Sequence, residues 1–139
     1  MKQVKFRGRC GSHSWYYGSL VQDSYTDSDG ELRTISYILE GPAIRRTSEG
    51  RVFKSEVVDT ATVGQFVGLR DKNGKEIYEG DIIKAGDEKE KIEVRFVRGV
   101  FAFLWNGDLD DEFPCNAPTH EWAEVIGNIH DNPKLIKRR

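Results

Sequence analysis

Two cysteine–histidine pairs hold the residues of this sequence best suited to metal chemistry. Cys10 precedes His13 by three positions, and Cys115 precedes His120 by five. Thiolates and imidazoles are the usual ligands of tetrahedral zinc, and each pair has a usable spacing. A zinc site requires the two distant pairs to meet in space, whereas two reduced thiols near polar histidines require nothing further. The second interpretation is favoured, so we expect no metal site and no cofactor.

Nucleophilic catalysis has weaker support from the same segments. A Cys–His catalytic pair needs a thiol with a lowered pKa, and no pattern in the sequence indicates one. Ser12 and Ser14 flank His13, but the Gly-x-Ser-x-Gly elbow that exposes a catalytic serine is absent. The sequence also has neither a P-loop nor the dinucleotide-binding glycine pattern. We expect no catalytic residues and no enzymatic activity.

Two acidic segments offer oxygen ligands for a hard cation such as calcium or magnesium. One comprises Asp108, Asp110, Asp111 and Glu112, and the other is residues 27–31. Neither spacing matches an EF-hand loop. Solvated loop charges explain the first segment, and an Asx-type turn explains the second.

A basic strand face near the start of the chain is the more interesting candidate. Lys5, Arg7 and Arg9 alternate with Phe6 and Gly8, so a strand would project the three cations from one face. Their repeat of roughly 6.6 Å is close to the phosphate spacing along a nucleic-acid strand. The Trp15–Tyr17 segment could add surface for base stacking. The alternative, which we favour, is an edge strand that charge protects against edge-to-edge association.

The composition predicts a mainly β protein. The 139 residues include 21 Val and Ile against 7 Leu, and the 14 glycines suit many tight turns. The net charge of −2 gives no reason to expect a nucleic-acid partner. The sequence has no apolar run of membrane-spanning length and no apolar stretch after Met1 that resembles a secretory signal. We therefore expect no membrane association and a cytoplasmic location.

Short alternating segments separated by turns predict small antiparallel sheets or barrels with short helical turns only. We expect a loop at residues 43–50 and a helical turn after Asn132. Two β lobes are expected at 1–58 and 59–139, although one cooperative domain over 1–139 is equally consistent with the sequence. Predicted strands cover residues 3–10, 15–21, 31–39, 51–58, 65–69, 76–78, 82–83, 92–96, 100–105 and 122–126.

The alternation also predicts core residues and one hairpin turn. Asn73 and Gly74, between apolar runs, indicate a type I′ turn in which both residues have positive φ. The apolar side of each strand gives six expected core side chains: Phe66, Ile82, Val94, Phe96, Phe103 and Trp122.

The central block at residues 63–83 closely resembles the signature of the YopX-like phage and prophage proteins. Residues 4–7 and 124–133 resemble the two ends of that family, in the same order along the chain. The resemblance implies a small, largely β protein of phage or prophage origin, with no established activity. The strand entry at Gly80 and Asp81 resembles an SH3-like barrel in the C-terminal part. Structural turns are expected at Asn73, Gly74, Gly80, Asp81, Gly127 and Asn128.

These observations together favour a non-catalytic binding module. We expect an unknown protein partner rather than nucleic acid, in the cytoplasm of a bacterial host. An enzyme of unrecognised type and a structural or assembly protein are the alternatives, and a homo-oligomer is compatible with each.

Overall fold

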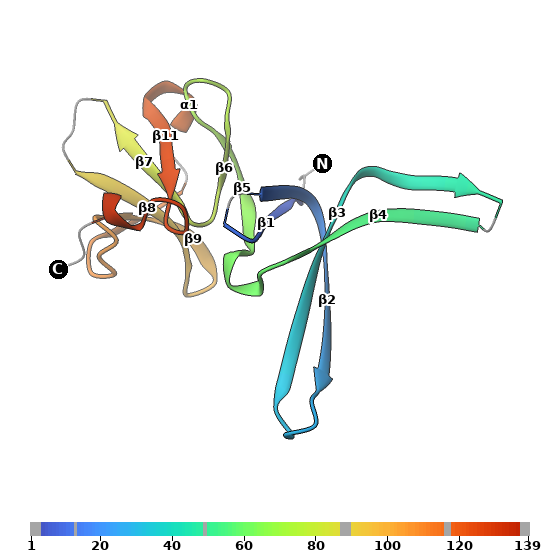
Figure 1. Ribbon diagram of the computed structural model, residues 1–139. Helices are drawn as coiled ribbons and strands as arrows, with labels where there is room; N and C mark the ends of the chain where they lie inside the picture. Colours follow the sequence, from blue (N-terminus) through green and yellow to red (C-terminus); the bar gives the residue numbers. More distant parts are fainter. Residues whose placement is uncertain (1–3, 13, 49, 87–89, 116–117, 137–139) are drawn as a thin grey trace. The chain divides into compact units, whose positions relative to one another are not determined.

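The computed structural model describes residues 4–12, 14–48, 50–86, 90–115 and 118–136 (Figure 1). The chain forms two compact units, which divide between Gln65 and Phe66. Both units are built from antiparallel strands, so the prediction of a mainly β fold is confirmed. The division falls later than the predicted one at residues 58 and 59. Whether the lobes unfold separately or together stays a prediction.

The N-terminal unit is an antiparallel sheet with strand order β4-β3-β2-β1, followed by the first residues of β5. A 3₁₀ turn, η1 (Thr60–Thr62), begins at Asp59, whose side chain accepts a hydrogen bond from the backbone of Ala61. The strands are β1 (Phe6–Cys10), β2 (Ser14–Thr26), β3 (Leu32–Thr47), β4 (Gly50–Val58) and β5 (Gly64–Arg70).

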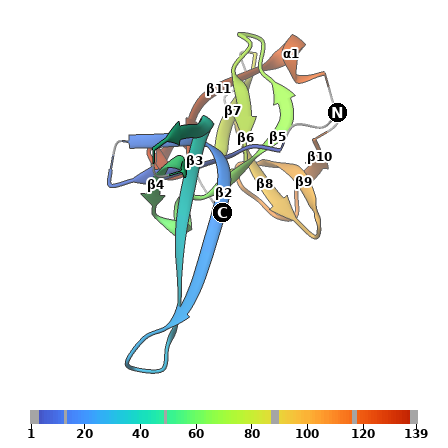
Figure 2. The same ribbon diagram turned by 90° about the vertical axis from the view of Figure 1, so that its right-hand side faces the viewer.

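Strand β3 takes part in two hairpins in succession. Residues 32–39 pair with β2, and residues 36–39 and 44–47 pair with β4, as far as the Thr47–Gly50 pair. The register shifts between Leu39 and Ile44, where Gly41 and Pro42 interrupt the ladder. From this point the two hairpins diverge (Figures 1 and 2). The loop predicted at residues 43–50 is therefore wrong, because paired strands occupy most of it despite its polar sequence.

Among the side chains of this unit that the structure describes, few buried ones are apolar. Ile38 is fully buried and Val58 is 4% exposed. A Cβ atom on Gly8 would lie 2.5 Å from a methyl group of Val58, so only glycine allows β4 to pack this closely on β1. The unit depends on a narrow core at the centre of its sheet.

The C-terminal unit contains a five-stranded antiparallel sheet with order β10-β9-β8-β7-β11, and β6 pairs with β5. Strands β10 and β11 are edges of this sheet over the residues described, so the expected closed barrel is corrected to an open sheet. The elements are β6 (Glu76–Tyr78), β7 (Asp81–Ala85), β8 (Lys91–Val97), β9 (Val100–Trp105), β10 (Glu112–Pro114), α1 (Thr119–Trp122), β11 (Ala123–Asn128) and η2 (Pro133–Leu135). As predicted, the described helical segments are short, and Pro133 opens η2.

Aliphatic and aromatic side chains pack between these strands. Ring centroids of Phe103 lie 5.3 Å from Phe113 and 5.8 Å from Trp122, both in edge-on geometry. Such aromatic pairs add to the stabilisation from buried area. The central cluster comprises Ile77, Ile83, Ile92, Val94, Phe103 and Ala123.

The structure confirms most of the predicted core. Phe66, Ile82, Val94 and Phe103 are buried. Trp122 is half-buried, because it ends α1 and does not belong to the strand predicted there.

Phe96 is 51% exposed, so its predicted burial is wrong. Its strand face is the predicted one, shared with the buried Val94. Pairing between β7 and β8 stops at Glu93, however, so Phe96 lies on the part of the β8–β9 hairpin that extends past β7. There its ring contacts Phe101, at 5.1 Å between centroids, and remains open to solvent on the other side.

Candidate functional site

The basic residues near the start of the chain lie on and beside β1. Arg7 is opposite Tyr17 on β2, and Arg9 is opposite Trp15, so these four side chains share one face of the sheet. Lys5 precedes β1 and is half-buried. Tyr16 lies opposite Gly8 and therefore on the other face, which removes it from the predicted stacking surface.

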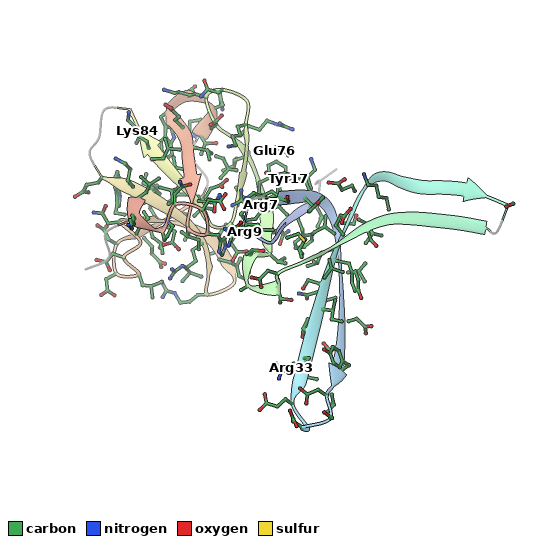
Figure 3. All side chains as sticks on the ribbon, viewed as in Figure 1. Arg7, Arg9, Tyr17, Arg33, Glu76 and Lys84 are labelled. Carbon is green, nitrogen blue, oxygen red and sulfur yellow. The ribbon has the colours of Figure 1, made fainter. Side chains whose placement is uncertain are left out.

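Both guanidinium groups are held by one indole ring. The Cζ atom of Arg7 lies 4.7 Å from the centroid of Trp15, and that of Arg9 lies 5.9 Å away. Figure 3 shows the two arginines side by side on β1. Arg7 is only 4% exposed. A buried guanidinium stacked on an aromatic ring stabilises the sheet and is poorly placed to reach a phosphate in solvent.

Strand β1 is not an edge of its sheet. It pairs with β2 along its whole length and with β5 at Phe6 and Arg7. The favoured interpretation of Lys5, Arg7 and Arg9 as edge protection is therefore wrong. Nucleic-acid binding by these residues stays a prediction, in which the more exposed Arg9 and Lys5 would contribute more than Arg7.

The zinc candidates fall in different units of the chain. Cys10 belongs to the N-terminal unit, and Cys115 and His120 belong to the C-terminal unit. His13 lies outside the described residues. His120 is exposed, at 70%, and lies 3.8 Å from the carboxylate of its neighbour Glu121. Within the part of the chain that the structure describes, no three His, Cys, Asp or Glu side chains gather as metal ligands would.

The two cysteines differ in environment. Cys10 is exposed, whereas Cys115 is half-buried beside the C-terminal core. Burial raises the pKa of the Cys115 thiol to about 12, because the thiolate would lose its hydration. At neutral pH this side chain is a thiol, which is a poor nucleophile and a poor metal ligand.

The acidic residues of the segment 27–31 form a turn at the tip of the β2–β3 hairpin. One carboxylate oxygen of Asp27 accepts hydrogen bonds from the backbone of Asp29 and Glu31, at 2.9 and 3.0 Å. The other oxygen accepts from Nε of Arg33 at 2.7 Å. The hydrogen bond from Arg33, followed by those from the backbone, lowers the pKa of Asp27. This carboxylate is already used in an Asx-type turn.

The second acidic segment is also engaged in local contacts. Asp108 accepts a hydrogen bond from the backbone of Asp110 at 2.9 Å, and Glu112 forms an ion pair with Arg98. These contacts agree with solvated loop charges.

The predicted turn at Asn73 and Gly74 is present, in a different form. Gly74 has a φ of +82°, but Asn73 is not among the residues with positive φ. The backbone N–H of Gly74 donates to the carbonyl of Asp71, and that of Asp71 donates to the carbonyl of Lys75. This pattern is that of a three-residue loop with glycine in the left-handed position, so the predicted two-residue type I′ turn is wrong.

Asp71 connects this turn to the last strand of the sheet. One carboxylate oxygen accepts from the backbone of Asn73 and Lys75, at 2.9 Å each. The other accepts from the backbone of Val125 in β11 at 3.0 Å, across 54 positions of sequence. The backbone of Lys72 also donates to the carbonyl of Ala123. One side chain therefore fixes both the hairpin and the entry of β11.

The charge of Asp71 is stabilised by these donors. Asp71 is 2% exposed, and burial by itself opposes ionisation of its carboxyl group. The hydrogen bonds from Val125, Lys75 and Asn73, together with the charge of Lys75, outweigh that effect and lower the pKa of Asp71.

The predicted turn at Gly80 leads directly into β7, of which Asp81 is the first residue. Gly80 has a φ of +92°, and its backbone bonds to the carbonyl of Val94 and the N–H of Ile129. Asp81 is 1% exposed and accepts a hydrogen bond from the backbone of Tyr78 at 2.7 Å. This turn therefore holds β6, β8 and the end of β11 together.

Gly127 and Asn128 are the last two residues of β11, and the turn predicted there follows at residues 129–131. A Cβ atom on Gly127 would lie 2.4 Å from the side-chain oxygen of Asn132, which itself accepts from the backbone of Asn128 at 3.2 Å. The side-chain oxygen of Asn128 accepts from the backbone of His130 and Asp131. The role of both residues is architectural.

Three of the exposed apolar side chains of the N-terminal unit lie on an arm formed by residues 19–35. It is the outer part of the β2–β3 hairpin, beyond the pairing of β2 with β1 and before the pairing of β3 with β4 (Figure 1). Val21 is 46% exposed, Tyr25 47% and Leu32 74%. Val21 and Tyr25 lie on one face of the arm and Leu32 on the other, so both faces carry apolar surface.

The sequence model of the YopX protein family matches residues 5–137 of this chain. The chain belongs to the YopX family. Among proteins with curated descriptions, no match to it is found.

Two solved structures resemble this YopX-family chain. The crystal structure of protein EF1440 from Enterococcus faecalis is 25% identical, with a TM-score of 0.51, over 99% of this chain and 100% of that one. The crystal structure of protein yopX from Bacillus subtilis is 20% identical, with a TM-score of 0.46, over 100% of this chain and 99% of that one. Within the described residues, no helix is long and apolar enough to cross a membrane.

The YopX resemblance at residues 63–83 covers turn and core residues, among them Asp71. Sequence reasoning did not single out Asp71, although an aspartate before a Lys-Asn-Gly turn is a signal for side-chain-to-backbone bonds. It also missed the arm, because the alternation of residues 15–21 and 31–39 does not show that both faces are open. In this YopX-family chain the buried carboxylates of Asp71 and Asp81 hold turns and strands together, whereas the outer part of the arm is exposed.

Proposed function

We propose that this chain is a non-catalytic binding module of phage or prophage origin whose partner is a protein in the cytoplasm of a bacterial host. Membership of the YopX family supports the origin. The five-stranded antiparallel sheet supports an SH3-like C-terminal lobe over 59–139, without a closed barrel. Fold alone does not determine function, so the proposal depends on a surface.

The observation that carries the proposal is the exposure of the arm on both faces. Each described residue from Val21 to Thr26 and from Glu31 to Thr34 is exposed. An isolated two-stranded ribbon is at best marginally stable in water, so a ribbon with apolar side chains gains stability from a partner. Proteins recognise such ribbons by burying apolar side chains and by pairing with the backbone at their edges.

The exposed charges on the arm favour a protein over nucleic acid. Asp23, Asp29 and Glu31 are exposed, and Asp27 pairs with Arg33, so the tip is acidic (Figure 3). Like charges would repel a phosphate backbone. A salt titration of a labelled oligonucleotide tests the alternative. Salt-sensitive micromolar binding, weakened when Lys5, Arg7 and Arg9 are all neutralised, would contradict the proposal.

The experiment for the proposal compares the chain with a shortened-arm variant. Gln22 pairs directly with Ser36, so residues 23–35 can be replaced by an Asn-Gly turn without changing the register of the remaining ladder. The two tagged proteins are used as bait in extracts of prophage-carrying cells, and captured proteins are identified by mass spectrometry.

A captured protein is then purified and titrated against both forms. The proposal expects saturable binding by the full chain and at least tenfold weaker binding by the shortened variant, with an unchanged thermal midpoint. Equal affinity of the two forms would show that the arm is not the binding surface.

A further inference from the structure

One edge of the arm has no strand beside it within the described residues. Strand β2 pairs with β3 from Ser19 to Thr26, but its pairing with β1 ends at Gly18. The eight residues of 19–26 therefore present a continuous row of backbone donors and acceptors along the outer side of β2. Such a row is a template for another strand.

This edge lacks the protection that proteins usually give to free strands. Strand β2 has 13 residues, no proline and one charged side chain, Asp23. Strand β4, the other outer strand of this unit, has nine residues and three charges: Arg51, Lys54 and Glu56. Charged side chains on edge strands discourage pairing between sheets. The sequence thus protects the β4 edge and leaves the β2 edge open.

We infer that a second copy of this chain pairs with residues 19–26 in antiparallel fashion, giving a four-stranded ribbon of order β3-β2-β2-β3. The inference rests on the arm proposed above as the binding surface, and it names the partner strand. A two-fold pairing of this kind is self-complementary, because one patch meets its own copy.

The charges of the arm select the antiparallel orientation. The tip carries Asp27, Asp29 and Glu31 against the single cation Arg33. Parallel arms would bring two acidic tips together, whereas antiparallel arms place the tips at opposite ends of the shared ribbon. Screening over about 10 Å at ordinary salt concentration then removes most of the repulsion.

A two-fold axis through Gln22 also suits the side chains. It places Val21 opposite Asp23 of the second copy and Ser19 opposite Tyr25, so the one charge of the edge does not face itself. Val21 and Tyr25 of both copies lie on one face of the ribbon, where cross-strand neighbours can cover apolar surface that is exposed in the single chain.

Sedimentation velocity on the purified chain, from micromolar to hundreds of micromolar, tests this pairing. Gln22→Lys sets two cations against each other at the axis and should weaken the dimer at least tenfold. Thr34→Lys is the matched control: it adds the same charge to an exposed position of β3, on the side of the arm away from the β2 edge, and should leave the dimer unchanged. A mixture of Gln22→Lys and Gln22→Glu chains should restore association. Circular dichroism confirms that each variant folds.

The outcomes are distinct. A dimer weakened by Gln22→Lys, retained by Thr34→Lys and restored in the mixture supports the inference. A parent chain that stays monomeric at hundreds of micromolar overturns it, as does equal weakening by both lysine variants. A monomer that still binds another protein through the arm would overturn this inference alone. A dimer that the shortened-arm variant retains would also overturn this inference alone, because the contact between copies would then lie outside the arm.

Discussion

Replacing Asp71 with asparagine removes one acceptor from a carboxylate that joins two parts of the C-terminal unit. Asparagine retains one oxygen, which can still accept from the turn at Asn73 and Lys75. Its amide NH₂ group then faces the backbone N–H of Val125, so two donors oppose each other where a 3.0 Å hydrogen bond existed. The entry of β11 into the sheet should loosen.

The size of the loss follows from the type of bond. A hydrogen bond to a charged group contributes about 1.5–3 kcal/mol to the free energy of unfolding. The loss is greater when the remaining donor is buried than when water can replace the missing acceptor. Asp71 as a whole is 2% exposed, so water does not readily replace its carboxylate. We expect Asp71→Asn to lower the free energy of unfolding at pH 7 by about 1.5–3 kcal/mol, measured by urea titration with tryptophan fluorescence.

The effect should depend on pH in a defined direction. The pKa of Asp71 is lowered in the folded chain, whereas an unfolded aspartate titrates near about 3.9. The stabilisation from its charge is therefore fully present above about pH 5 and is lost as the pH falls through the folded pKa. The difference between parent and Asp71→Asn should be largest at neutral pH and shrink on acidification.

Asp27→Asn is the matched control, because Asp27 also accepts two backbone hydrogen bonds within an Asx-type turn. Because this turn lies at the exposed tip of the arm, Asp27→Asn should lower the free energy of unfolding clearly less than Asp71→Asn does. Equal losses from the two variants, or a difference at Asp71 that persists unchanged at pH 3, would refute the role assigned to the Asp71 carboxylate.

Gly74→Val should cost about 1 kcal/mol or more, because a β-branched residue disfavours positive φ, and an unchanged melting temperature would contradict the turn geometry. No atom lies within 4 Å of a Cβ at Gly74, so crowding does not contribute. Phe103→Ala should cost about 3–5 kcal/mol and Phe96→Ala about 1 kcal/mol in the same denaturation assay, and equal costs would show that the exposure of Phe96 is misjudged. Iodoacetamide at pH 8 should modify Cys10 and spare Cys115, whose raised pKa leaves about one-thousandth of the usual thiolate. Similar rates by intact-mass spectrometry would contradict the burial of Cys115.

Local patterns were sufficient to predict many of the strands and turns. Alternation at residues 92–96 gave the correct face of β8, because neighbouring side chains on a strand always point to opposite sides. It could not give the exposure of Phe96, which depends on where the partner strand β7 stops. The segment 43–50 was misjudged for a related reason: its pairing with β4 overrides a polar composition that is typical of loops.

The candidate site was harder to predict, because its decisive contacts join residues that are far apart in the sequence or that meet only when strands pair. The burial of Arg7 depends on Trp15 across the sheet, and the position of Asp71 depends on Val125. The spacing of the two cysteine–histidine pairs could be seen in the sequence. Whether the two segments that carry them lie close together depends on the whole fold.

The place of β11 in its sheet has a consequence for synthesis of the chain. Strand β7 pairs with β8 on one side and with β11 on the other, yet β11 begins 38 positions after β7 ends, at Ala123 against Ala85. While the ribosome is making the intervening residues, the β7 edge that carries Ile82 and Ile83 has no strand to cover it. A nascent or prematurely terminated chain would therefore expose an apolar template for aggregation, and release of the last strand is the step that removes it.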